Sequence, residues 1–147
     1  MFTIAGAIAA ALLLSPATLA LDRPGTVQIT ASEAKQTHFD TGKPGLSIGD
    51  VDVYNLLLYN KRITPHAIGH AEMICTRVGL KRQSCTANYV LPKGEIAVQG
   101  VIDSRLIYEL AVIGGTNLYN NVRGSLTVTS IHRSNPSREL LVFRLVV

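Results

Sequence analysis

The chain has 147 residues, of which 47% are hydrophobic and 16% are charged, and its formal net charge is +4. This length suits one domain, and the composition excludes an intrinsically disordered chain. The basic residues form scattered pairs, Lys61-Arg62 and Lys81-Arg82, at expected turns and without an aromatic stacking pattern, so we expect no nucleic-acid partner.

The first 21 residues carry no charge, and their apolar run ends at Ser15-Pro16. That run is shorter than the roughly 20 apolar residues of a spanning helix. Thr18 and Ala20 supply small side chains at the −3 and −1 positions of a cleavage site. We therefore predict a signal peptide over residues 1–20 and a secreted, extracellular protein. No Lys or Arg precedes the run, which leaves a displaced start or a retained anchor as alternatives.

Residues 21–49 are polar and contain Gly and Pro, and they predict one short strand at Val27–Thr30 followed by a loop around Thr41–Gly45. Residues 50–147 alternate between strand and turn patterns, without helical periodicity over three turns. Together the two parts predict one β-barrel domain.

Seven further strand candidates are rich in Val, Ile, Leu, Thr or Tyr and are separated by turn signals. They are Val51–Tyr59, Ala67–Val78, Gln83–Leu91, Glu95–Ile102, Leu106–Ile113, Val122–Ile131 and Glu139–Val147. Eight strands with short links favour an antiparallel meander that closes into a barrel, because closure removes exposed edges. A barrel of eight strands has room for packed side chains or for one small ligand.

The chain has two cysteines, Cys75 and Cys85. If the third and fourth strands form a hairpin centred on Leu80, the two cysteines lie directly opposite each other, within reach of a disulfide. Export favours the bridge, and two reduced, buried thiols are the alternative. The spacing matches no metal-ligand pattern, so we predict no metal site.

Four segments together resemble a known family. They are Ser47–Asp50 leading into Val51–Tyr59, then Cys85–Ile96, then Val98–Gly100, and finally Glu109–Tyr119 running to Arg123-Gly124. Their order and spacing resemble the allene oxide cyclase barrel-like superfamily, which includes the dirigent proteins. The resemblance covers roughly residues 45–124 and is more specific for the fold than for the reaction.

The resemblance implies an eight-stranded barrel that holds a reactive molecule. Allene oxide cyclases steer the ring closure of a fatty-acid epoxide, and dirigent proteins steer the coupling or cyclisation of phenolic radicals or quinone methides. Both act mainly by positioning. Neither needs a metal or an organic cofactor, so we expect none here, and related barrels assemble as dimers or trimers.

Three charged residues are candidate catalytic groups. Asp50 matches the family's Gly-Asp position and could act as a general acid, or it could bond to nearby backbone N–H groups. Glu109 could face the cavity, where burial would raise its pKa, or it could lie on the outer face. Arg123 matches the family's Arg-Gly segment and could bind a carboxylate or quinone oxygen, or it could pair with Asp50 or Glu109.

Four residues are candidate ligand contacts: Tyr54, Asn88, Gln99 and Tyr119. Tyrosine offers an apolar wall with a hydroxyl group, although core packing and outward-facing positions are the alternatives for this set. Leu118 stands where the dirigent pattern has an acid, which weakens a strict dirigent interpretation and favours a hydrophobic ligand.

The sequence thus predicts an exported barrel that binds a small hydrophobic or phenolic molecule and steers its cyclisation or isomerisation. A non-catalytic, lipocalin-like binding protein is the alternative. A structural or adhesion protein, with a barrel filled completely by side chains, is a third hypothesis.

Overall fold

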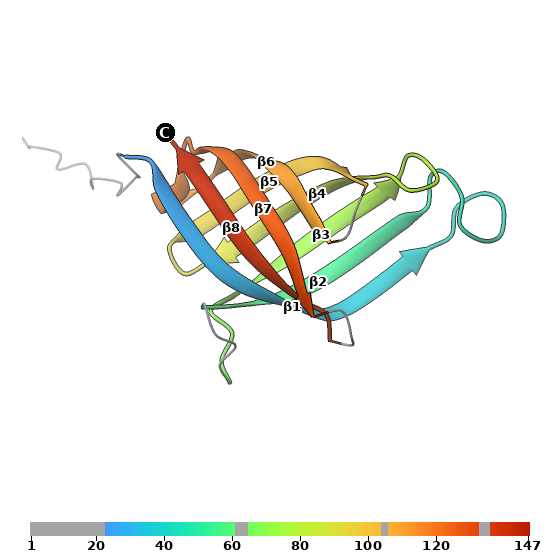
Figure 1. Ribbon diagram of the computed structural model, residues 1–147, viewed down its shortest axis with the longest axis horizontal. Coiled ribbons are helices and arrows are strands. Elements are labelled where there is room, and N and C mark those ends of the chain that lie inside the picture. The colour runs from blue at the N-terminus through green and yellow to red at the C-terminus, as the bar shows by residue number, and fades with distance from the viewer. Residues whose placement is uncertain (1–22, 61–64, 104–105, 133–135) are drawn as a thin grey trace, which may run out of the picture.

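The structure, a computed structural model, describes residues 23–60, 65–103, 106–132 and 136–147 (Figure 1). Its strands are β1 (Gly25–Phe39), β2 (Val51–Tyr59), β3 (Gly69–Arg77), β4 (Gln83–Leu91), β5 (Gly94–Ile102), β6 (Ile107–Gly115), β7 (Arg123–His132) and β8 (Arg138–Val146). Each strand pairs antiparallel with its neighbours in sequence, and β1 pairs with β8, so the sheet closes on itself. The predicted eight-stranded antiparallel barrel is confirmed. The predicted signal peptide at residues 1–20 lies outside the described residues.

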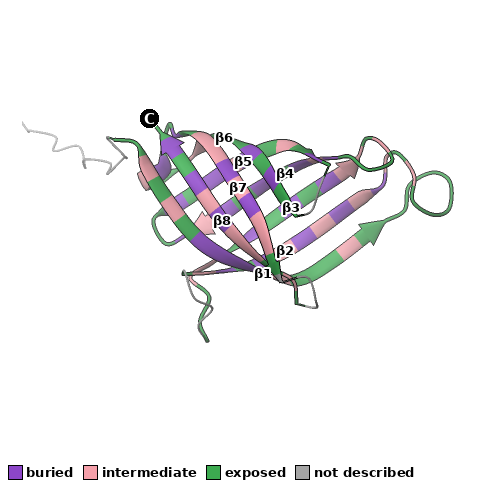
Figure 2. Cartoon of the chain, in the orientation of Figure 1, coloured by how far each residue is buried: buried purple, intermediate pink, exposed green. Residues whose placement is uncertain are grey.

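Buried and exposed residues alternate along most strands, as the two faces of a closed sheet require (Figure 2). The predicted bounds of β2 and β4 match the structure, and those of β3, β5, β6, β7 and β8 differ by one or two residues. The short strand predicted at Val27–Thr30 is wrong in length, because β1 continues to Phe39. Its second half, rich in polar residues, pairs with β2 as fully as the first half pairs with β8.

A β-bulge in β1 changes which side chains face the interior. The pairing with β2 shifts between Glu33 and Lys35, and Ala34 is the extra residue. Glu33 pairs with Leu56, and Gln36 pairs with Tyr54. The bulge therefore brings Glu33 and Gln36, three positions apart, to the same face of the sheet, where regular alternation would place them on opposite faces.

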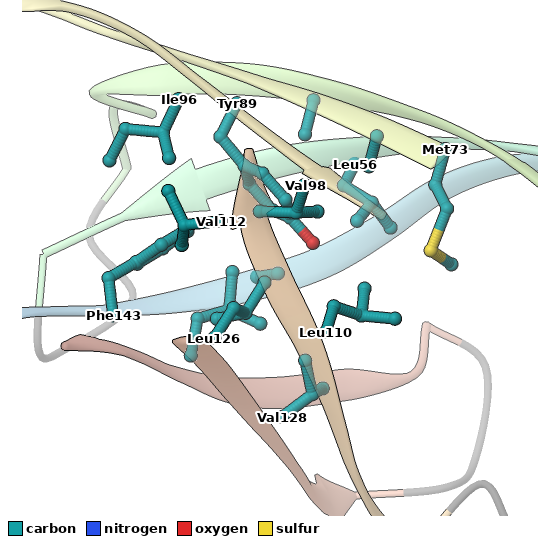
Figure 3. Close-up of a cluster of buried hydrophobic side chains, with 14 of the residues drawn as sticks. Leu56, Met73, Tyr89, Ile96, Val98, Leu110, Val112, Leu126, Val128 and Phe143 are labelled. Atoms are coloured by element: carbon teal, nitrogen blue, oxygen red, sulfur yellow. The ribbon is translucent and has the colours of Figure 1, made fainter. Parts of the chain in front are cut away.

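One half of the barrel interior is a packed hydrophobic core. Tyr89 and Phe143 contact each other edge to face, with ring centroids 5.2 Å apart, and both are buried. Figure 3 shows these rings among aliphatic side chains from β5, β6 and β7, including Val98, Val112 and Leu126. We call this half the closed end, because side chains fill it.

The β6–β7 connection completes the closed end. It contains a single 3-10 turn, Asn117–Tyr119, whose Tyr119 is buried in the core. Gly115 permits this close packing, since a Cβ there would lie 2.5 Å from the carbonyl oxygens of both Glu95 and Tyr119. In the described part of the chain, no helix has the length and apolar character needed to cross a membrane.

Candidate functional site

The other half of the barrel interior holds a cavity of about 580 Å³. It is lined where β1, β3, β5 and β7 end and where β2, β4, β6 and β8 begin, so it opens at the end opposite the packed core. Its apolar lining consists of Ala31, Leu56, Met73, Cys75, Ile102 and Leu106. A volume of this size accommodates an organic molecule of several rings or a medium-length chain.

Polar side chains line two sides of the cavity. On the β1, β2 and β4 side they are Gln36, Tyr54 and Gln83, and on the side of β1, β6, β7 and β8 they are Glu33, Tyr108, Ser130, Ser137 and Glu139. The Tyr108 hydroxyl lies 3.5 Å from Oε2 of Glu139, and the Ser137 hydroxyl donates to Oε2 of Glu33 at 3.1 Å. The cavity therefore combines an apolar wall with carboxylates and hydroxyls that can orient a ligand or exchange protons with it.

Asp52 does not line the cavity, but it hydrogen-bonds to Gln36 and Gln83, which do. Its Oδ1 lies 2.9 Å from Nδ1 of His38 and accepts a longer hydrogen bond from Gln36, while its Oδ2 accepts a 2.6 Å hydrogen bond from Nε2 of Gln83. Gln36 also lies 3.3 Å from the Tyr54 hydroxyl. Asp52 thus fixes the orientation of two amide groups that line the cavity, and we regard it as a positioning residue.

The carboxyl of Asp52 is buried, and burial alone would raise its pKa. Hydrogen bonds from His38, Gln83 and Gln36 favour the ionised form and outweigh burial, so the pKa is lowered from its ordinary value of 3.8. A carboxyl whose pKa is lowered by folding stabilises the protein above the unfolded-state pKa, and this contribution is lost as the pH falls through the folded-state pKa.

We expect Asp52→Asn to lower the free energy of unfolding by about 1–3 kcal/mol at pH 7, because buried donors lose their charged acceptor. The difference between variant and wild type should shrink as the pH falls below 3.8, where the unfolded state takes up a proton at this carboxyl, and should vanish below the lowered pKa of Asp52 in the folded state. Urea unfolding of both proteins at pH 7 and near pH 3 measures this difference in the free energy of unfolding. Asp103→Asn, at an exposed aspartate, is the matched control. A loss that is equally large at both pH values would contradict this role for the Asp52 charge.

Asp50 does not line the cavity. Its carboxylate accepts hydrogen bonds from the Ser47 N–H (2.6 Å), the Thr41 N–H (3.0 Å) and the Ser47 hydroxyl (2.9 Å). The Ser47 and Thr41 N–H groups are the main cause of its lowered pKa. This geometry is the loop-bonding alternative left open by the sequence, and it makes Asp50 the anchor of the β1–β2 loop.

Glu109 and Arg123 lie on the outside of the barrel. Glu109 is exposed on β6, between the inward-facing Tyr108 and Leu110. Arg123 is exposed at the start of β7, and its guanidinium donates to the Val122 carbonyl at 2.8 Å. Neither residue lines the cavity.

Of the four predicted ligand contacts, Tyr54 alone lines the cavity. Asn88 and Gln99 are exposed on the outer faces of β4 and β5. Tyr119 is buried in the core at the closed end, where burial raises its pKa. Leu118 packs against the same core.

Cys75 and Cys85 form a disulfide, as predicted. The expected register of the hairpin is also confirmed, with Cys75 opposite Cys85 and Met73 opposite Ala87. The bridge links β3 to β4 at the wall of the cavity, because Cys75 is one of the lining residues.

Removing the bridge with the double substitution Cys75→Ala, Cys85→Ala should lower the free energy of unfolding by about 2–3 kcal/mol, since a crosslink over ten residues restricts the unfolded chain. Denaturant unfolding of the variant and of the wild type, with and without reductant, measures the effect. Reductant should destabilise the wild type by a similar amount and leave the variant unchanged. A variant as stable as the oxidised wild type would contradict the prediction.

Sequence reasoning missed most of the polar lining. Glu33 and Gln36 lie in β1 beyond the predicted strand Val27–Thr30, and Glu139 is the second residue of β8, a strand whose inner face could not be assigned from alternation alone. Asp52 carried a signal that could have found it, since it is an acid flanked by Val51 and Val53 in a predicted strand.

The sequence matches no family model and no curated protein. Solved structures do match its fold. A pyocyanin demethylase superposes with a TM-score of 0.69 and 25% identity, covering 83% of this chain and all of that one. A pterocarpan synthase dirigent protein gives a TM-score of 0.65 at 14% identity, with 84% of this chain and 83% of that one covered. A Diels–Alderase from Streptomyces koyangensis gives 0.65 at 15% identity, with 85% and 70% covered.

The chain has the fold of the dirigent and cyclase barrels. The predicted resemblance to this superfamily is thereby confirmed at the level of fold. The names of the three proteins denote a demethylation, a dirigent reaction and a cycloaddition. Proteins with this fold therefore catalyse or direct different reactions, and the fold alone does not indicate which reaction a given member carries out.

Proposed function

We propose that the barrel binds one small, mainly hydrophobic organic molecule in its cavity and steers the cyclisation or isomerisation of that molecule. The observation that carries the proposal is the cavity itself, about 580 Å³ in volume, apolar on one wall and lined by carboxylates and hydroxyls on others. A purely structural role would predict a barrel filled by side chains, whereas the lining residues surround a cavity.

Shape and polar groups supply different parts of the chemistry. The apolar wall restricts the conformations of a bound ligand, which favours one folding of the molecule over others. Glu33 and Glu139 can accept or donate protons, and Tyr54 and Tyr108 can bind a ligand oxygen through their hydroxyls. We assign these four residues to the site, and no role in it to Asp50, Glu109 or Arg123.

The disulfide supports a further part of the proposal, namely that the protein works outside the reducing cytosol. Disulfides persist in secreted and extracellular proteins and are rare where thiols are kept reduced. Export through an N-terminal signal segment accords with this bridge.

The first experiment is a thermal-melting screen against fatty acids, polyketides, phenolics and pyocyanin. A ligand at a hundredfold excess over its Kd should stabilise the protein by about 2.7 kcal/mol, which is readily visible as a rise in Tm. The absence of a shift with every class would contradict a binding function for the cavity.

The second experiment separates an enzyme from a carrier. Reactive precursors of the class that binds are incubated with wild-type protein, and the products are separated by chiral chromatography. The Glu139→Gln variant should retain binding and lose product selectivity or rate. Tight binding without any change in products, in wild type as well as variant, would support the lipocalin-like alternative and contradict the catalytic part of the proposal.

A further inference from the structure

Three hydrophobic side chains at the cavity end are unusually exposed. Leu80, Leu46 and Ile48 have exposed fractions of 93%, 75% and 71%, the highest of the large hydrophobic residues that the structure describes. Leu80 lies at the tip of the β3–β4 turn, and Leu46 and Ile48 lie in the β1–β2 loop. We call residues 40–50 and 78–82 the rim loops.

The rim loops lie side by side at one end of the barrel, at the right of Figure 1. The Gly49 N–H donates to the Arg77 carbonyl at 2.9 Å, and the Arg77 N–H donates to the Asp50 carbonyl at 2.8 Å. The Asp50 carboxylate holds the β1–β2 loop from within, through its bonds to Thr41 and Ser47. The exposed apolar side chains are therefore carried on loops with defined hydrogen bonds.

Basic residues accompany these apolar tips. Lys43, Lys81 and Arg82 are exposed on the rim loops, and Asp40 is the exposed carboxylate there. One oxygen of Asp40 already accepts a hydrogen bond from the Gly45 N–H. Positive charge around projecting aliphatic side chains is the pattern by which proteins bind an anionic membrane surface, where the side chains enter the headgroup region and the cations contact the lipid phosphates.

The rim loops lie at the end of the barrel where the cavity opens. They adjoin the strand ends that carry Cys75 and Gln83, both of which line the cavity. A hydrophobic ligand dissolved in a bilayer could then enter the cavity without crossing water. A protein interface has a fully buried, more apolar centre, whereas here separate side chains project from two loop tips.

We propose that the rim loops dock the barrel on an anionic lipid bilayer, with the cavity end toward the membrane. The proposal does not depend on any reaction inside the cavity, and it holds for a carrier as well as for an enzyme.

The test uses the full chain and vesicles of equal parts phosphatidylcholine and phosphatidylglycerol, with pure phosphatidylcholine as the neutral comparison. The sequence contains no tryptophan, so Leu80→Trp creates a single reporter at the rim. Its fluorescence should shift to the blue on addition of anionic vesicles and change less with neutral ones. Ile113→Trp, on the outer face of β6 near the closed end, is the matched control and should show no shift.

Vesicle flotation of rim variants then measures separately how much the apolar and the basic side chains contribute to membrane binding. The triple variant Leu46→Ser, Ile48→Ser, Leu80→Ser should lose about tenfold or more in vesicle affinity. The variant Lys43→Glu, Lys81→Glu, Arg82→Glu should lose binding to anionic vesicles in particular. Both variants should melt as the wild type does, because the replaced side chains are exposed.

Residues 1–21 are apolar and identical in all variants, so any vesicle binding that they contribute is the same in each comparison. An emission spectrum of the Leu80→Trp variant that anionic vesicles leave unchanged would overturn the proposal. It would equally be overturned if the triple serine variant bound vesicles like the wild type. If that variant changed the oligomeric state measured by light scattering and left vesicle binding unchanged, the rim would be an interface between copies of the chain, which also contradicts membrane docking.

Discussion

Replacing Ala31 by phenylalanine should strongly weaken ligand binding while the barrel still folds. Ala31 lies on β1 with 1% of its surface exposed, and it lines the cavity. A phenyl ring at this position occupies the space that we assign to the ligand, so we expect a loss of at least about tenfold in affinity. Isothermal titration with the ligand that raises the Tm most in the screen measures this loss.

Ala111→Phe is the matched control for Ala31→Phe, because Ala111 is exposed on the outer face of β6. It should leave the affinity unchanged. The Ala31→Phe variant itself should be destabilised by no more than about 1–3 kcal/mol, since the ring enters an existing cavity and does not overpack a filled core. If Ala31→Phe bound the ligand as tightly as the wild type, the binding site would lie elsewhere.

Replacing Phe143 by alanine should have the opposite profile, with a large loss of stability. Its ring is fully buried at the closed end and contacts Tyr89 edge to face. We expect the free energy of unfolding to fall by about 3–5 kcal/mol, because the apolar contacts are lost and a void remains. Urea unfolding followed by circular dichroism measures the change.

Phe39→Ala is the control for Phe143→Ala, since Phe39 is about half exposed at the end of β1. Its replacement should change the free energy of unfolding by about 0.5 kcal/mol or less. Ligand affinity of the Phe143→Ala variant should stay near that of the wild type under conditions where it is folded. A loss of stability below about 1 kcal/mol for Phe143→Ala would show that the closed end is not the packed base of the barrel.

These two substitutions test whether stability depends on one end of the barrel and ligand binding on the other. The closed end is filled by aromatic and aliphatic side chains, whereas the open end keeps a cavity with carboxylates in its walls. Partial burial of carboxylates costs free energy, and a packed hydrophobic half can offset that cost. Stability and binding therefore depend on different sets of residues within one small domain.

The sequence was sufficient to predict the barrel because the relevant information is local. Alternation and turn residues marked seven of the eight strands to within two residues of their observed bounds. The disulfide followed from the expected hairpin register, which sets Cys75 opposite Cys85. The family-like motifs added the expectation of closure, and the structure confirms it.

The candidate site was harder to predict, because it depends on which face of each strand turns inward. Both faces of β6 are largely apolar in sequence, so alternation left the side of Glu109 open, and the structure places it outside. The bulge at Ala34 brings Glu33 and Gln36 to one face, which regular alternation does not permit. The roles of Asp50 and Asp52 also differ, although they are two residues apart, because one meets loop N–H groups and the other meets side chains from β1 and β4.

By itself, the sequence determined the elements, their order and the cysteine pairing, because strand propensity, alternation and turn chemistry act between residues close along the chain. Tertiary structure alone decided where the cavity lies and which side chains line it. Closure of the sheet brings Glu33 and Glu139 to the wall of one cavity from opposite ends of the described chain, and it packs Tyr89 and Phe143 against each other at the other end. The volume left empty depends on how all eight strands fit together, and no local pattern specifies that fit.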